Sequence, residues 1–176
     1  SQRLMERFDV KRGVVKQVSA EGGLAALASR HFENVESSGD NSFAGSHDIM
    51  VEIDGHYDDK GALFINIRNV PPNFDDPEAK KTAMDSRRRW IVFLDDANGY
   101  KSKQRGDKAK EWGKKASKAK SAVSAAHHFI KMASDLSADI ETQAQAMIAE
   151  IEEALEANDN TRAFGRGEKL NKLLNP

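Results

Sequence analysis

The clearest strand pattern lies between Ile49 and Arg68, a segment that reads IMVEIDGHYDDKGALFINIR. Apolar residues recur at every second position in both of its halves: Ile49, Val51 and Ile53 in the first, and Leu63, Ile65 and Ile67 in the second. Successive side chains of a strand point to opposite faces of a sheet, so each half predicts a strand with one apolar face. The segment from Gly55 to Gly61 favours a turn, and the pair therefore predicts an antiparallel hairpin.

A long helix is predicted after the hairpin, over about residues 77–97. Asp75 or Asp76 can cap its first turn, Pro77 has the backbone angle that a first turn needs, and Glu78 suits the positive end of the helix dipole. Gly99 can adopt the left-handed conformation that ends a helix. One face of this helix carries apolar residues: Ala79, Ala83, Trp90, Ile91 and Leu94.

Weaker patterns precede the hairpin. Residues Phe8–Val10 predict a short strand, and Ser19 can cap a helix. The apolar positions of that helix recur at spacings of three and four: Leu24, Leu27, Ala28 and Phe32. Together these elements predict an α+β fold over residues 1–105, a small two-layer α/β sandwich with an antiparallel sheet.

A helical extension is predicted over residues 106–159. Apolar residues step by three and four along a seam from Ala109 to Ala133, and a second stripe runs from Leu136 to Leu155. Heptad seams of this kind pack against another helix, as in a coiled coil. A continuous rod and an antiparallel hairpin folded at about 134–138 both satisfy the pattern, and we favour the hairpin.

Charge is the reason for that preference. The net charge of the whole chain is −1, but twelve basic residues stand against four acidic ones between residues 87 and 120. Residues 134–159 hold eight acidic residues and no basic one. A hairpin would bring the basic helix against the acidic helix. Residues 160–176 are expected to form a short C-terminal tail with a helix around Leu170, Leu173 and Leu174.

Three segments resemble a known family: FDVKRG at Phe8–Gly13, the hairpin around Gly61, and FLDDANGYKSKQR at Phe93–Arg105. Over about residues 5–110 the chain resembles an archaeal family of unknown function whose members are small two-layer α/β sandwiches. The third segment is the most specific, although Asn98 stands where the family usually has Thr. The resemblance implies this fold and an archaeal-type cytoplasmic setting, and it transfers no catalytic residue.

Enzyme motifs are absent from the sequence. The chain has no phosphate-binding Gly-Lys-Ser/Thr loop, no dinucleotide-binding glycine fingerprint and no nucleophile elbow. It also has no cysteine, which excludes disulfides and thiolate chemistry. Four potential ligands lie close together, but their spacing matches no established metal site: His47, Asp48, Asp54 and His56. We therefore predict no catalytic residue, no metal and no cofactor, and a cytoplasmic protein without a membrane-spanning segment.

The basic residues from Arg87 to Lys120 form the candidate binding surface. Lys and Arg contact the phosphate backbone of nucleic acids without reading its sequence. The candidates are Arg87, Arg88, Arg89, Lys101, Lys103, Arg105, Lys108, Lys110, Lys114, Lys115, Lys118 and Lys120. They predict a non-enzymatic protein that associates with nucleic acid or the ribosome.

Two alternatives stay open from the residues alone. The lysines can instead keep a helix soluble and pair with the acidic helix, while the seam over 109–155 serves as a protein–protein interface in a homo-oligomer or with another partner. The second alternative is an enzyme with an unrecognised site near His47–His56.

Overall fold

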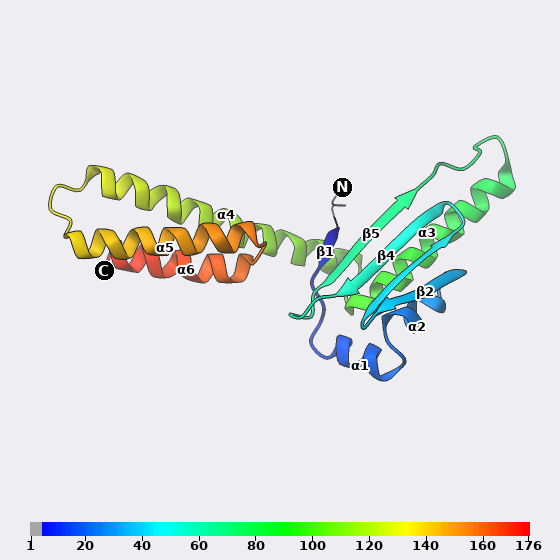
Figure 1. Cartoon of the computed structure of the whole chain (residues 1–176). Coiled ribbons are helices and arrows are strands. Elements are labelled where there is room, and N and C mark those ends of the chain that lie inside the picture. The colour runs from blue at the N-terminus through cyan, green and yellow to red at the C-terminus, as the bar shows by residue number, and fades with distance from the viewer. Residues whose placement is uncertain (1–4) are drawn as a thin grey trace. The chain divides into compact units, whose positions relative to one another are not determined.

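The computed structural model describes residues 5–176 of the chain (Figure 1). These residues form one five-stranded sheet and six helices. The chain divides into two compact units, of which the first ends at Lys108 and the second runs from Ala109 to Pro176. The first unit contains the sheet, and the second is helical.

The sheet of the first unit has the strand order β1-β5-β4-β3-β2, and all neighbouring strands are antiparallel. Its strands are β1 (Glu6–Phe8), β2 (Asn34–Gly39), β3 (Ser42–His47), β4 (Met50–Tyr57) and β5 (Leu63–Asn69). The predicted hairpin is confirmed as the β4–β5 pair, in which Ile53 is paired with Ile67. A shift of register after Met50 makes Met50, rather than Val51, a buried core residue.

Three helices complete the first unit: α1 (Val14–Ala20), α2 (Leu24–Ser29) and α3 (Pro77–Asn98). The prediction for α3 is confirmed at both ends. The side chain of Asp76 accepts a hydrogen bond from the backbone N–H of Glu78 at 3.0 Å, and Gly99 ends the helix with a φ of 79°. These local signals therefore place α3 correctly before any tertiary contact is considered.

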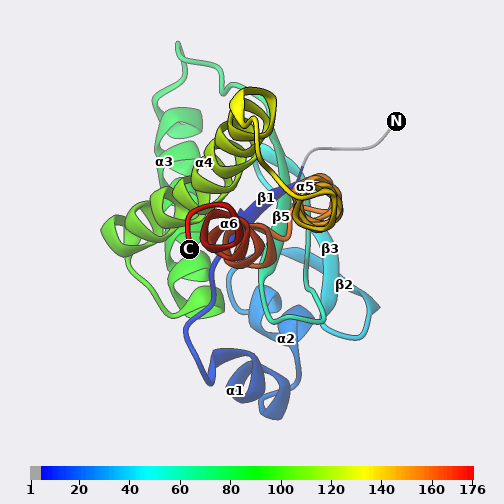
Figure 2. The same cartoon turned by 90° about the vertical axis from the view of Figure 1, so that its left-hand side faces the viewer.

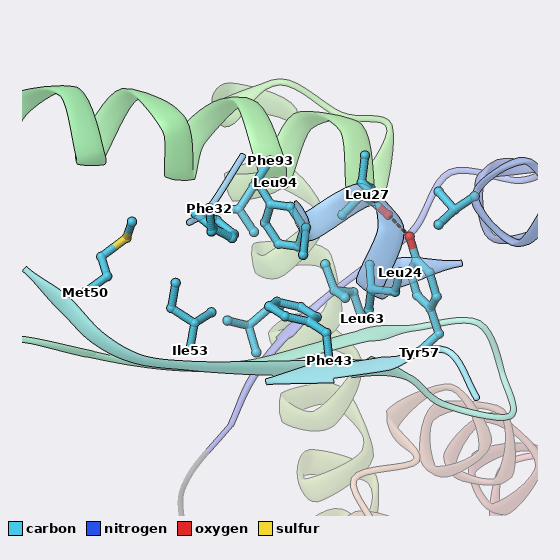
Figure 3. Close-up of a cluster of buried hydrophobic side chains, with 14 residues drawn as sticks. Leu24, Leu27, Phe32, Phe43, Met50, Ile53, Tyr57, Leu63, Phe93 and Leu94 are labelled. Atoms are coloured by element: carbon cyan, nitrogen blue, oxygen red, sulfur yellow. Dashed lines mark hydrogen bonds between the residues drawn. The ribbon is translucent and has the colours of Figure 1, made fainter. Parts of the chain in front are cut away.

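The core lies between the helices and one face of the sheet. Figure 3 shows side chains from both layers meeting there: Leu24, Leu27, Phe93 and Leu94 from the helices, and Phe43, Ile53 and Leu63 from the strands. The buried hydroxyl of Tyr57 donates a hydrogen bond to the carbonyl of Ala97 at 2.6 Å, which links β4 to the end of α3. The first unit is therefore a two-layer α+β sandwich, as predicted.

Two predictions for the region before β4 are wrong in detail. Ser19 lies inside α1 and does not cap one long helix, because Gly22 and Gly23 adopt φ values of 107° and 91° and separate α1 from α2. The first strand is Glu6–Phe8 and not Phe8–Val10. The β2–β3 hairpin was not predicted, because its sequence is mostly polar and small and lacks a clear alternation.

The second unit consists of most of α4 (Ser102–Met132) together with α5 (Ala138–Glu156) and α6 (Asn160–Leu174). Figures 1 and 2 show α5 and α6 side by side, packed along α4. A continuous rod is excluded because the chain turns between α4 and α5. The side chain of Ser137 caps α5 by accepting a hydrogen bond from the N–H of Ile140 at 3.1 Å.

The last helix is much longer than the predicted tail helix. It begins at Asn160 and passes through Gly165 and Gly167. A Cβ atom at Gly167 would lie only 3.3 Å from the Cβ of Ala122, so glycine here permits a close approach of α6 to α4. The core of the unit is formed by residues of all three helices: Ala119, Ala126, Ala144, Ile148, Ile151, Ala154, Ala163, Leu170 and Leu174.

Candidate functional site

The candidate basic residues are divided between the two units. Seven of them, from Arg87 to Lys108, belong to the first unit, and the five from Lys110 to Lys120 belong to the second. Within each unit their contacts and exposure differ.

The three arginines of α3 differ in their contacts. Arg89 forms an ion pair with Asp85 at 2.9 Å, and its hydrogen bond lowers the pKa of Asp85. Arg89 also donates to the carbonyl of His31 at 3.2 Å. Arg88 is exposed, and its side chain has no hydrogen bond or ion pair among residues 5–176. Arg87 lines a groove of the first unit.

Arg105 is a structural residue, and its predicted place on an exposed surface is corrected. Only 8% of its side chain is exposed, and it pairs with the carboxylate of Asp95. It also donates to the carbonyl of Tyr100 at 2.6 Å and to the hydroxyl of Ser102 at 3.0 Å. These bonds tie the end of α3 to the start of α4 and engage both terminal nitrogens of the guanidinium.

The carboxyl of Asp95 is ionised in these surroundings. Burial opposes its ionisation, but hydrogen bonds from Arg105 and from Lys101, whose Nζ lies 3.2 Å away, outweigh burial and lower the pKa of Asp95. Nearby, Lys103 pairs with Asp107 at 3.2 Å. The basic residues at this junction are therefore largely balanced by acidic partners within the first unit.

Three lysines of the second unit, Lys110, Lys114 and Lys118, form what we call the lysine face. They are exposed and follow one another at four-residue intervals on one side of α4. The Nζ atom of Lys118 lies 5.6 Å from the ring centre of Phe164 on α6. This aromatic neighbour was not predicted, because only the packing of α6 on α4 brings it there.

The other two candidate lysines of the second unit lie apart from the lysine face. Lys115 is partly buried, donates to the hydroxyl of Thr161 at 3.2 Å and lies 5.8 Å from the ring centre of Trp112. Lys120 follows Lys118 by two residues, which places the two on nearly opposite sides of the helix.

The acidic helix does not neutralise the lysine face, contrary to the charge pairing expected of the hairpin. Glu150 of α5 pairs instead with Arg166 of α6 at 3.1 Å. The remaining glutamates of α5 are exposed: Glu141, Glu152, Glu153 and Glu156. In the part of the chain that the structure describes, the three lysines of the lysine face form no ion pair.

The four potential metal ligands around β4 are separated by the sheet. His47 is buried on the helix side and accepts a hydrogen bond from the N–H of Glu33 at 3.1 Å. Asp54 and His56 point to the opposite face, since Ile53 points into the core. Residues 5–176 contain no group of three or more His, Cys, Asp or Glu placed to hold a metal ion. Over the same residues, no helix has the length and apolar character to cross a membrane.

Comparison with known families covers the first unit. A family model described as "Domain of unknown function (DUF5611)" matches residues 5–111. No curated protein and no solved structure matches the chain. The match ends at Glu111, so most of the helical unit lies beyond it.

Proposed function

The chain belongs to the DUF5611 family, whose function is unknown, and we propose its function from the exposed surface. The protein is non-enzymatic and binds the phosphate backbone of nucleic acid, either free or in the ribosome. The binding surface is the lysine face of α4. An archaeal, cytoplasmic setting belongs to the same proposal.

One observation carries this proposal: Lys110, Lys114 and Lys118 are exposed in a row and have no acidic partner within the described chain. A rise of 1.5 Å per residue puts about 6 Å between successive members of the row and about 12 Å between its ends. A backbone of repeating phosphates offers a matching series of negative charges. Phe164, next to Lys118, adds a ring on which an unpaired base can stack.

The size of the effect follows from the number of contacts. Three phosphate contacts give a slope of about −2 to −3 for the logarithm of affinity against the logarithm of salt concentration, so affinity falls about 20- to 40-fold between 50 and 200 mM salt. Such binding is independent of sequence, because phosphate contacts position a protein without reading bases.

The test is the triple substitution Lys110→Glu, Lys114→Glu and Lys118→Glu in the full chain. Binding of nuclease-treated protein to labelled RNA and DNA, and co-sedimentation with ribosomes, would be measured at 50 and 200 mM salt. We expect the wild type to bind with the stated salt dependence and the triple variant to lose binding at both concentrations, while circular dichroism shows an unchanged helix content.

A matched control reverses three exposed basic residues of α6: Arg162→Glu, Lys169→Glu and Lys172→Glu. It changes the net charge by the same amount at positions outside the lysine face. The proposal fails if wild-type binding is insensitive to salt, or if the control loses as much affinity as the triple variant.

The alternative function, an interface along the helical seam, is not favoured by any specific contact. Ala119, Ala126, Ala144 and Ile151 of the seam are buried in the core of the second unit, where they pack on helices of the same chain. A dimer or larger species in light scattering, together with no nucleic-acid binding, would favour that alternative.

A further inference from the structure

The first unit contains an apolar groove that the proposed function does not use. It lies between α3 and the ends of β4 and β5 and has a volume of about 520 Å³. Pockets that bind small molecules have volumes of about 300–1,000 Å³ and mostly apolar linings with a few polar groups. The groove meets both criteria, and its lining includes Met50, Phe74, Met84, Trp90 and Ile91.

Its apolar side chains are unusually exposed for a folded domain. Phe74 is 68% exposed and Met84 is 59% exposed, and both border the same groove. Neighbouring large apolar residues on a surface mark binding sites more often than scattered single ones do. Methionine in particular adapts its shape to a ligand because its side chain is unbranched and flexible.

Two positively charged side chains line the groove. Lys80 and Arg87 line it from α3, seven residues or about two helical turns apart. Neither side chain forms an ion pair or a hydrogen bond among residues 5–176, in contrast to the side chain of Arg89 on the same helix. A ligand with a negative charge at one end would satisfy them, and an apolar body would fill the rest of the groove.

The lining residues also indicate whether the apolar part of the ligand is a nucleobase or a hydrocarbon chain. Among the residues that border the groove, only Asn69 carries a side-chain amide able to pair with the polar edge of a nucleobase. The aliphatic and thioether side chains of Ile49, Ile67, Met50 and Met84 suit a hydrocarbon chain. The groove follows α3 from residue 80 to residue 91, a length of about 16 Å.

We propose that this groove binds an acyl anion, a molecule with an aliphatic chain and a terminal carboxylate. The carboxylate lies against Lys80 and Arg87, and the chain lies along Met84, Trp90 and Phe74. The site is independent of the lysine face, which belongs to the other unit.

The test uses Trp90 as a reporter. The chain has two tryptophans, so Trp112→Phe leaves Trp90 as the single one. Decanoate would be titrated below its micellar concentration into this full-length variant, with decanol as the uncharged comparison. We expect a saturable change in Trp90 fluorescence and affinity for decanoate about tenfold higher than for decanol, because only decanoate pairs with the two cations.

Two variants in the same background locate the site. Lys80→Gln with Arg87→Gln is expected to lower decanoate affinity about tenfold and to leave decanol affinity unchanged. Met84→Glu, at an exposed position, is expected to weaken decanoate binding at least tenfold by placing a negative charge in the groove. Val92→Glu is its matched control, since Val92 is 47% exposed on the same helix and does not border the groove.

Three results would each overturn the proposal: no change in Trp90 fluorescence with decanoate, equal affinities for decanoate and decanol in the reporter protein, or an equal loss of affinity from Val92→Glu and Met84→Glu. None of them bears on nucleic-acid binding, so the two proposals fail separately.

Discussion

Replacing Asp95 by Asn is expected to lower the free energy of unfolding of the first unit by about 3 kcal/mol, the lower end of the range for breaking a buried ion pair. The reason is that Arg105 stays charged and buried after its carboxylate partner is neutralised. Only 14% of the Asp95 side chain and 8% of the Arg105 side chain are exposed, so water cannot replace the lost partner. Urea unfolding followed through Trp90 in the Trp112→Phe background measures the first unit by itself.

Asp96→Asn is the matched control, since Asp96 is the next residue and 51% of its side chain is exposed. Its contact is a hydrogen bond to His31 at 3.2 Å, and we expect a loss of less than about 1 kcal/mol. Equal losses from the two substitutions would show that Asp95 and Arg105 do not stabilise this junction.

The same pair makes stability depend on pH in a defined direction. The pKa of Asp95 is lowered in the folded protein, so its contribution is present above the unfolded-state pKa of about 3.9 and is lost as the pH falls through the folded value. The difference in stability between the wild type and Asp95→Asn is therefore expected to be constant from about pH 5 to 7, where the carboxyl is ionised in both the folded and the unfolded state, and to shrink below about pH 4.

Gly167→Leu is expected to destabilise the second unit by about 2 kcal/mol, as overpacking does in a closed interface. A Cβ atom at this position would lie 3.3 Å from the Cβ of Ala122 and 3.5 Å from the Cα of Ala119, so a larger side chain here requires α4 and α6 to shift apart. Amide hydrogen exchange along α6 is the suitable measurement, because it reports local opening of this helix. Faster exchange from Ala163 to Leu174 is the expected result.

The matched control is Gly165→Leu, two residues away on the same helix. Nothing lies within 4 Å of a Cβ atom built at Gly165, and the residue is exposed. Leucine has a higher helix propensity than glycine, so this variant is expected to gain up to about 1 kcal/mol. Unchanged exchange in Gly167→Leu would mean that α6 does not pack closely on α4.

Sequence reasoning located the elements whose signals are local. The alternation around Ile53 and Ile65 predicted the central hairpin, and Asp76, Pro77 and Gly99 predicted the ends of α3. The β2–β3 hairpin gave no such signal, because only Phe43 and His47 of its residues are buried and the others, apart from Val35, are small or polar. Its strands are held by pairing with β4, which is a long-range interaction that no short window of sequence contains.

The candidate binding surface likewise combines features that are visible in the sequence with features that depend on tertiary contacts. The four-residue spacing of Lys110, Lys114 and Lys118 is visible in the sequence, and so are the high basic charge of α4 and the acidic charge of α5. The spacing could not show that Arg105 is buried against Asp95, since both are charged residues of types that are usually exposed. The sequence pattern also gave no sign that Phe74 and Met84 border the same groove.

Local patterns in the sequence were enough to locate the central hairpin, the ends of α3 and the row of lysines on α4. Which charged side chains form ion pairs within the protein, and which stay exposed on its surface, depends on the packing of the helices. The physical reason is that helix and strand periodicity depends on neighbours within a few residues. An ion pair, in contrast, can join residues that are far apart in the sequence and that only the packing of helices and strands brings together. Glu150 pairs with Arg166 of α6, and the lysine face stays exposed with no ion pair among residues 5–176.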